Sequence, residues 1–199
     1  TIHIHKRLPM GGGLGGGSSN AATTLLAMNR LWELNLGEDQ LAEIGLRLGA
    51  DVPVFVRGHA AFGEGVGEKL TPTNPPEDWF VVLKPECNIS TGKIFSAEGL
   101  TRDTPKIKIR PAFEGDASRY RNDCEDVVRK LYPEVHQSLE WLSQFGPARL
   151  TGTGACIFGR FPTESAARII WESKPSGVTG FVAKGVNKSP LHKKLTELK

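Results

Sequence analysis

The sequence has few cysteines, and they form no pattern that builds a site. Its 199 residues include three, Cys87, Cys124 and Cys156, and no C-x-x-C pair. An odd number of widely separated cysteines gives no support to a disulfide framework or a zinc site, and it fits a reducing compartment. We therefore expect a cytoplasmic protein without disulfide bonds.

Long apolar runs and concentrated charge are missing as well. No apolar stretch approaches the length that crosses a bilayer, and no signal peptide is recognisable. The 25 basic and 22 acidic residues give a net charge of +3, and the densest basic groups, KIKIR (106–110) and HKK (192–194), are short. A nucleic-acid surface needs a concentrated basic stripe. We therefore expect a globular protein with neither a membrane nor a nucleic acid as partner.

Glycine is abundant and is concentrated in one segment, PMGGGLGGGSSNAATTLL (9–26). Composition alone is typical of a flexible linker, but the flanks favour a built loop. Upstream, TIHIHKRL (1–8) alternates isoleucine and histidine, which predicts a half-buried strand. Downstream, apolar residues from Asn20 recur at helical spacing, and Gly37 predicts the helix end. A strand, a glycine loop and a helix N-terminus in this order indicate an anion site, because the free helix N–H groups face whatever the loop encloses.

Two common phosphate-binding patterns fit this segment poorly. A Walker A loop needs a lysine after its last glycine, and none follows here. The dinucleotide fingerprint G-x-G-x-x-G is met by Gly11, Gly13 and Gly16, but a glycine-rich tract meets it by chance. That fold also needs a second strand ending in an acidic residue about 20 residues later, where this sequence predicts a helix.

The rest of the chain predicts alternating strands and helices. The Pro-rich segment 71–78 indicates a domain boundary, and after Pro75 the pattern suggests an α+β arrangement with helices on one face of a sheet. Before this boundary we predict a helix with Leu41, Ile44 and Leu48 on one face and its end at Gly49, followed by a hairpin around Gly63, Gly65 and Gly67. After it we predict a strand over 79–83 and two helices within 121–147, the first of them capped near Asn122. The last predicted elements are two strands around the glycine loop at 151–159, a capped helix from Thr163 and a strand within 180–186.

Two glycine motifs, taken together, resemble those of the GHMP kinases. PMGGGLGGGSSNAA (9–22) resembles the second motif of that family and TGTGACIFG (151–159) its third, and two motifs in the right order are more specific than either alone. LGADVPVFVRGHAAFGEGVGE (48–68) and NDCE (122–125) further resemble one branch of the family. Its members transfer the γ-phosphoryl group of ATP to a hydroxyl of a cytidyl-bearing substrate in isoprenoid synthesis. The alternatives are a GHMP kinase for another small molecule and an inactive nucleotide-binding fragment.

The resemblance implies an α+β GHMP kinase fold of two α/β sandwich-like domains. These would be the remainder of a ribosomal S5-like, ATP-binding N-terminal domain (1–73) and a ferredoxin-like C-terminal domain (74–199). It also implies ATP and Mg²⁺ as cofactors, a small-molecule substrate, and a monomer or weak homodimer. Family members carry further residues before the position that matches Thr1, including a motif with a lysine. We therefore expect the 199-residue chain by itself to be inactive.

The resemblance assigns the nucleotide and the catalytic base to two segments. Asp51 would be the base, although an aspartate before Val-Pro is equally typical of a helix cap. Ser18 and Ser19 would lie near Mg²⁺, although serine and asparagine commonly cap helices as well. The residues that would bind the nucleotide are Pro9, Met10, Gly11, Gly12, Gly13, Leu14, Gly15, Gly16, Gly17, Ser18 and Ser19.

Four further residues are assigned to the substrate. Thr91 and Phe95 would approach its cytidine end, although an isolated phenylalanine is more often a core residue. Gly152 and Gly154 would let the second loop approach the substrate, although an ordinary hairpin turn also uses such glycines. A metal site at His3 and His5 is possible in principle, but an exposed strand face is the better interpretation.

Overall fold

The computed structural model describes residues 1–105 and 121–197, which divide into two compact units. Unit 1 consists of Thr1–Arg7, Gly15–Pro76 and Val186–Lys199, and unit 2 of Leu8–Leu14 and Glu77–Gly185. The first glycine segment is thus shared between the units. The KIKIR group lies outside the described residues, and the domain boundary at residues 73 and 74 stays a prediction.

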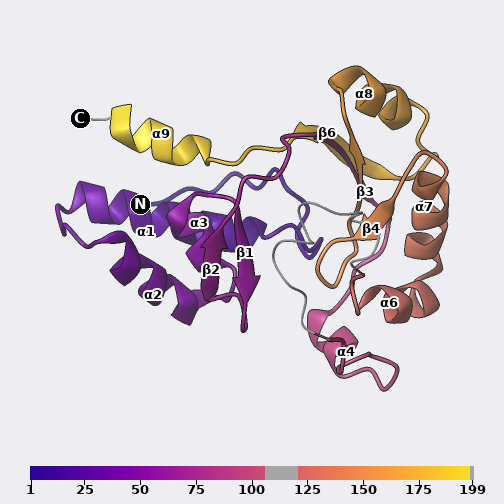
Figure 1. Ribbon diagram of the computed structural model, residues 1–199, viewed down its shortest axis with the longest axis horizontal. Helices are drawn as coiled ribbons and strands as arrows, with labels where there is room; N and C mark the ends of the chain where they lie inside the picture. Colours follow the sequence, from indigo (N-terminus) through magenta and orange to yellow (C-terminus); the bar gives the residue numbers. More distant parts are fainter. Residues whose placement is uncertain (106–120, 198–199) are drawn as a thin grey trace. The chain divides into compact units, whose positions relative to one another are not determined.

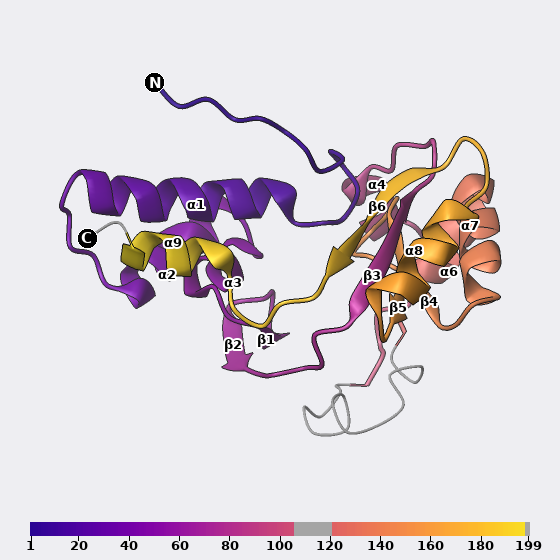
Figure 2. The same cartoon turned by 90° about the horizontal axis from the view of Figure 1, so that it is seen from above.

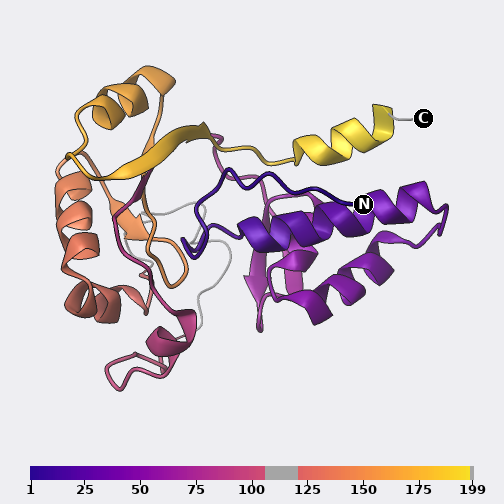
Figure 3. The same ribbon diagram turned by 180° about the vertical axis from the view of Figure 1, so that it is seen from behind.

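Unit 1 is a small helical layer with one hairpin (Figure 1). Its elements are α1 (Gly16–Leu31), α2 (Glu38–Leu48), α3 (Val52–Arg57), β1 (Ala61–Glu64), β2 (Lys69–Pro72) and α9 (Pro190–Glu197). The first three helices lie side by side, as Figure 3 shows from behind, and they share one apolar core. That core consists of Ala22, Leu41, Ala42, Val52 and Val56.

Unit 2 is an antiparallel four-stranded sheet with helices on one face (Figure 2). The strand order is β4-β5-β3-β6, so β3 is a central strand between β5 and β6. Its elements are β3 (Trp79–Lys84), α4 (Thr91–Phe95), α6 (Glu125–Leu131), α7 (Pro133–Ser143), β4 (Ala148–Leu150), β5 (Ile157–Phe161), α8 (Glu164–Glu172) and β6 (Thr179–Lys184).

The alternation along β3 explains how this sheet is covered. Val81 and Leu83 are fully buried in the core that the sheet shares with α6, α7 and α8. Successive strand residues point to opposite faces, so Phe80 lies on the other face. There its ring packs against that of Phe158, with the ring centroids 6.0 Å apart. The helices of unit 2 therefore cover one face of the sheet, as the sequence predicts.

Several predicted elements are confirmed and others are wrong. The hairpin, the strands of unit 2 and the helix capped by Thr163, whose hydroxyl accepts the Ala166 N–H at 3.2 Å, are present. The strand predicted within residues 1–8 is absent, and this segment is exposed and irregular. Ile2 and Ile4 remain more than half exposed, because no strand in the described part of the chain pairs with them. A pattern of alternation needs such a partner to become a strand.

The boundaries of the first helices also differ from the prediction. α1 begins at Gly16, inside the glycine tract, and ends at Leu31 rather than near Gly37. Gly37 instead occupies the N-cap position of α2, which ends at Leu48 with Gly49 as its C-cap residue, as predicted. On α2 the buried residues are Leu41, Ala42 and Gly45, so the predicted face, which included Ile44 and Leu48, is wrong by part of a turn. Among the described residues, none of the helices combines the length and apolarity that crossing a membrane requires.

Candidate functional site

The first glycine segment has a defined backbone conformation. Gly11, Gly13 and Gly15 have φ angles of 66°, 73° and 63°, a region that other residues enter only at a cost. Left-handed residues in a turn are a feature of backbone concavities that are lined by N–H groups and bind anions. The linker interpretation is therefore wrong, since every second residue of the loop has a specific geometry.

The N–H groups of this segment have no partners within the described residues. From Gly11 to Ser18 no backbone N–H donates a recorded hydrogen bond, and the first that does is Ser19, to the Gly15 oxygen at 2.8 Å. α1 begins without a side-chain cap, because its N-cap residue is Gly15. The predicted alternative, a serine or asparagine that caps the helix, is therefore not observed. The start of a 16-residue helix and the loop before it both present free donors.

The second glycine loop connects β4 to β5 and lies directly against the first within unit 2. The Cys156 N–H donates to the Gly12 oxygen at 3.2 Å, and the Thr151 hydroxyl donates to the Gly13 oxygen at 2.7 Å. A Cβ on Gly12 would lie 2.6 Å from the Cys156 Sγ, and one on Gly13 would overlap the Thr151 carbonyl. Glycine is required here because the two backbones touch. The sequence placed these motifs in order, and the structure brings them together.

Gly152 and Gly154 lie in the hairpin loop between the antiparallel strands β4 and β5, as the alternative predicted, and this loop is packed. Their φ angles are 54° and 85°, which glycine adopts readily. A Cβ on Gly154 would lie 2.9 Å from Leu150 Cδ1 and 3.0 Å from Ile89 Cδ1, so the loop rests on the core of unit 2. Gly152 is exposed, and its surface is open to a ligand.

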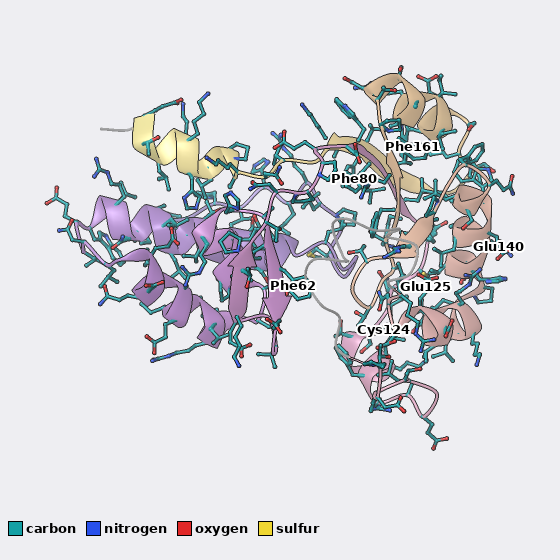
Figure 4. All side chains as sticks on the ribbon, in the orientation of Figure 1. Phe62, Phe80, Cys124, Glu125, Glu140 and Phe161 are labelled. Carbon is teal, nitrogen blue, oxygen red and sulfur yellow. The ribbon has the colours of Figure 1, made fainter. Side chains whose placement is uncertain are left out.

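Asn122 fixes the second loop through hydrogen bonds to its backbone, a role that the sequence alone did not predict. Its carboxamide donates to the Leu150 oxygen at 3.1 Å and to the Gly152 oxygen at 2.6 Å. The N-cap residue of α6 is Cys124, and the Asn122 Oδ1 accepts the Cys124 N–H at 3.0 Å, so the predicted cap near Asn122 is confirmed. Glu125, labelled beside Cys124 in Figure 4, accepts the Leu150 N–H at 3.0 Å. The NDCE motif was a signal for this position, but sequence alone did not say which backbone it binds.

Thr91 and Phe95 stand at opposite ends of α4. The hydroxyls of Thr91 and the buried Thr153 are 3.0 Å apart, which links α4 to the second glycine loop. Phe95 is 57% exposed, whereas its neighbour Ile94 is fully buried in the core. The interpretation of Phe95 as a core residue is therefore wrong, and its ring is free to stack on a ligand.

Asp51 lies in unit 1, in the turn between α2 and α3. It occupies the N-cap position of the six-residue α3, but its side chain makes no capping hydrogen bond. The residue is exposed, and no hydrogen bond or ion pair of its carboxylate is recorded among the described residues. A Cβ on Gly49 would lie 3.8 Å from the Ser18 Oγ, so this turn approaches the first turn of α1. The predicted capping role is absent, and the carboxylate remains available.

Burial makes Cys156 a neutral thiol. Loss of solvent around the fully buried side chain raises its pKa from 9.0 to about 11, against a smaller lowering by Lys84. The unfolded chain loses this proton near pH 9 and the folded chain near pH 11, so the folded state binds more protons between these values. By linkage, the stability is complete below about pH 9 and falls as the pH rises towards 11.

We therefore expect the free energy of unfolding to fall more steeply with pH in the native chain than in a Cys156→Ala variant. Urea unfolding followed at about pH 8, 9 and 10 measures both slopes. Equal slopes for the two proteins would contradict the assignment of the buried thiol.

Known proteins match this chain over its whole length. Residues 1–59 match the GHMP kinases N terminal domain and residues 108–173 match the GHMP kinases C terminal family. The chain is 98% identical over 199 residues to 4-diphosphocytidyl-2-C-methyl-D-erythritol kinase of Marinobacter nauticus, and it covers 69% of that protein. It is 57% identical to the same kinase of Hahella chejuensis, of which it covers 66%.

A solved structure of a kinase from the same family also matches this chain. The crystal structure of 4-(cytidine 5'-diphospho)-2C-methyl-D-erythritol kinase matches 91% of this chain and 68% of its own chain, with a TM-score of 0.76 and 30% identity. The chain thus spans about two thirds of the length of its relatives. Its fold is that of the GHMP kinases, and the chain belongs to the 4-diphosphocytidyl-2-C-methyl-D-erythritol kinases of this family.

Proposed function

We propose that this chain forms part of an enzyme that transfers the γ-phosphoryl group of ATP to the 2-hydroxyl of 4-diphosphocytidyl-2-C-methyl-D-erythritol. The 98% identity to a kinase of that name is the observation that carries the proposal. Because the chain spans about two thirds of its relatives, the proposal concerns the activity of the complete protein. The inactivity of the 199-residue chain alone stays a prediction.

The glycine segment is suited to hold the phosphates of the nucleotide. Its free N–H groups from Gly11 to Ser18 supply donors, and the absence of Cβ atoms lets oxygen atoms come close. Phosphoryl transfer asks the protein mainly to position the donor and to neutralise charge. Backbone N–H groups fixed in a loop do this without reorganising during the reaction. The residues present therefore fit ATP.

The residues also fit a Mg²⁺ ion that is held largely by the nucleotide. In the described part of the chain, no cluster of three or more His, Cys, Asp or Glu side chains could hold a metal. Mg²⁺ commonly takes few protein ligands and completes its shell with phosphate oxygens and water. Ser18 and Ser19, in the first turn of α1, would supply hydroxyl ligands. When bound, the ion neutralises charge on the phosphates.

Asp51 is the proposed base for the acceptor hydroxyl. Its carboxylate is exposed and free of a capping bond, so it can accept the proton as the new O–P bond forms. A γ-phosphoryl transfer needs one such acceptor near the hydroxyl and little other covalent chemistry. Within unit 2, Thr91, Phe95 and Gly152 would contact the substrate, with the exposed ring of Phe95 stacked on the cytosine, whereas the buried Gly154 would shape the loop that presents Gly152.

An ADP-release assay tests the proposed function. The chain would be completed with the remaining sequence of the Marinobacter nauticus relative and offered the cytidyl substrate, homoserine or mevalonate. We expect turnover with the cytidyl substrate alone. Turnover with homoserine or mevalonate instead would favour another small-molecule kinase. ATP binding without turnover on any of them would favour a nucleotide-binding protein without catalysis.

Replacement of Phe95 by alanine should weaken substrate binding selectively. The ring is 57% exposed, so its loss removes a stacking surface of about 1–3 kcal/mol but little core packing. We expect the KM for the cytidyl substrate to rise about tenfold or more, with little change in the KM for ATP. Steady-state kinetics on the completed protein measure both constants.

The neighbouring residue provides the control for this prediction. Ile94 is fully buried, so Ile94→Ala should lower the melting temperature, whereas Phe95→Ala should not. Equal rises of both KM values in Phe95→Ala, together with a lower melting temperature, would mean that the ring serves folding.

A further inference from the structure

We infer that Thr151 is a positioning residue whose hydroxyl couples the two glycine loops. The inference rests on the proposed function, because it treats the first loop as the phosphate site and the second as part of the substrate site. The hydroxyl donates to the Gly13 oxygen at 2.7 Å across a separation of 138 residues in the sequence. In the described residues this is the one side-chain hydrogen bond recorded between the two loops.

Both backbone polar groups of Thr151 form hydrogen bonds within the second loop. Its N–H donates to the Cys156 oxygen at 3.0 Å, and its own oxygen accepts the Gly154 N–H at 2.9 Å. Its backbone is therefore fixed by the loop itself, and its side chain is the part that reaches out to Gly13. Because Thr151 is fixed in the second loop, the bond from its hydroxyl fixes the position of Gly13 relative to that loop.

The first loop has to be fixed through its carbonyl oxygens, because its N–H groups are the proposed phosphate donors. Its N–H groups from Gly11 onward have no recorded partners in the described residues, so they do not fix the loop. Two carbonyls do so instead, Gly12 with the Cys156 N–H and Gly13 with the Thr151 hydroxyl. In a trans peptide a carbonyl and the N–H that follows it point in opposite directions, so the N–H groups of Gly13 and Leu14 face away from the second loop. The bonds that hold the loop therefore also orient its donors.

The other side of the second loop is held independently. Asn122 binds the Leu150 and Gly152 oxygens, and the Thr91 hydroxyl lies 3.0 Å from that of Thr153. Loss of the Thr151 hydroxyl therefore leaves the second loop in place. It frees only the first loop, at the carbonyl beside the proposed phosphate donors.

Two replacements at this position separate the hydroxyl from the shape of the side chain. Thr151→Val keeps the volume and the branched Cβ but removes the donor, whereas Thr151→Ser keeps the donor. The net contribution of one hydrogen bond corresponds to about 2- to 12-fold in an equilibrium constant. In the completed protein we expect Thr151→Val to raise the KM for ATP by about tenfold and to lower kcat, and Thr151→Ser to restore both within about threefold.

Thr179 offers a matched control in the same unit. Its hydroxyl donates to the Lys84 oxygen at 3.3 Å, also a side-chain bond to a distant carbonyl, but within the sheet. Thr179→Val should leave both KM values unchanged. The KM for ATP must therefore respond to the Thr151 hydroxyl and not to the loss of any threonine bond.

Hydrogen exchange provides a readout that does not depend on turnover. The Cys156 amide, which donates to the Gly12 oxygen, should exchange faster in Thr151→Val than in the native chain and in Thr179→Val. Unchanged exchange together with native KM values in Thr151→Val would overturn the inference. A completed native protein without kinase activity would instead overturn the proposed function, and the exchange rates would still decide whether Thr151 couples the loops.

Discussion

Replacement of Asp51 by asparagine is expected to remove most of the turnover while nucleotide binding and folding persist. Asparagine has nearly the same shape but cannot accept the hydroxyl proton, and a positioned base contributes about 10²-fold or more to a rate. The Asp51 side chain makes no capping hydrogen bond, so its loss should change the free energy of unfolding by less than about 0.5 kcal/mol. The measurements are kcat from ADP release, the Kd for ATP and the melting temperature, all on the completed protein.

A second aspartate in unit 1 provides the control. Asp39, in the first turn of α2, is exposed and pairs with Arg57 at 2.8 Å, and we assign it no role in the reaction. Asp39→Asn should therefore keep native turnover, and an exposed ion pair should cost at most about 1 kcal/mol of stability. If Asp51→Asn turned over at a rate close to that of Asp39→Asn, then Asp51 would not be the base.

Much of the fold could be predicted where local pattern and tertiary packing agree. The strand at 79–83 was predictable because a short apolar run next to a Pro-rich segment fits a central strand. The helix from Thr163 was predictable because threonine caps it and its apolar residues recur at helical spacing. The strand predicted within residues 1–8 failed because alternation records only a preference for two faces. A strand also needs a neighbour for its hydrogen bonds.

The start of α1 shows a different limit. Glycine disfavours helix interiors, so the sequence placed the helix start at Asn20 rather than at Gly16. In the first turn, however, the N–H groups have no partners within the helix, so glycine destabilises the helix less there than in its interior. The packing of Ala22 against α2 and α3 then fixes a helix that propensity alone would shorten.

The candidate site was predicted as a set of motifs but not as an arrangement. The glycines, Asp51 and Thr91 could be assigned by resemblance, since each stands in a recognisable stretch of sequence. The bond between Thr151 and Gly13 joins residues 138 positions apart, and no local pattern encodes it. The role of Asn122 was hidden for the same reason, because its partners are backbone oxygens of a distant loop. Residue types can thus be read locally, whereas their partners depend on the fold.

Alanine at Gly11 is expected to weaken ATP binding by about tenfold or more, through a Cβ placed among the phosphate donors. Gly11 has a φ of +66°, and a Cβ there would meet nothing within 4 Å. The substitution therefore adds backbone strain of about 1–2 kcal/mol but no clash within the protein. Gly177 has a φ of +80° and is equally open, but it lies in the connection between α8 and β6. Gly177→Ala should lower the melting temperature to a similar extent and leave the Kd for ATP unchanged.

A substitution at Gly17 tests the effect of an added methyl group on ATP binding without adding backbone strain. It lies in the first turn of α1, its φ is not in the left-handed region, and a Cβ there also meets nothing within 4 Å. Alanine favours a helix over glycine by up to about 1 kcal/mol, so Gly17→Ala should be at least as stable as the native protein. Because its N–H is one of the proposed phosphate donors, the added methyl group should nevertheless raise the Kd for ATP. Isothermal titration with ATP and thermal unfolding of the three variants test this. If Gly17→Ala bound ATP as the native protein does, and Gly11→Ala behaved like Gly177→Ala, the glycine segment would be a connection and not a phosphate site.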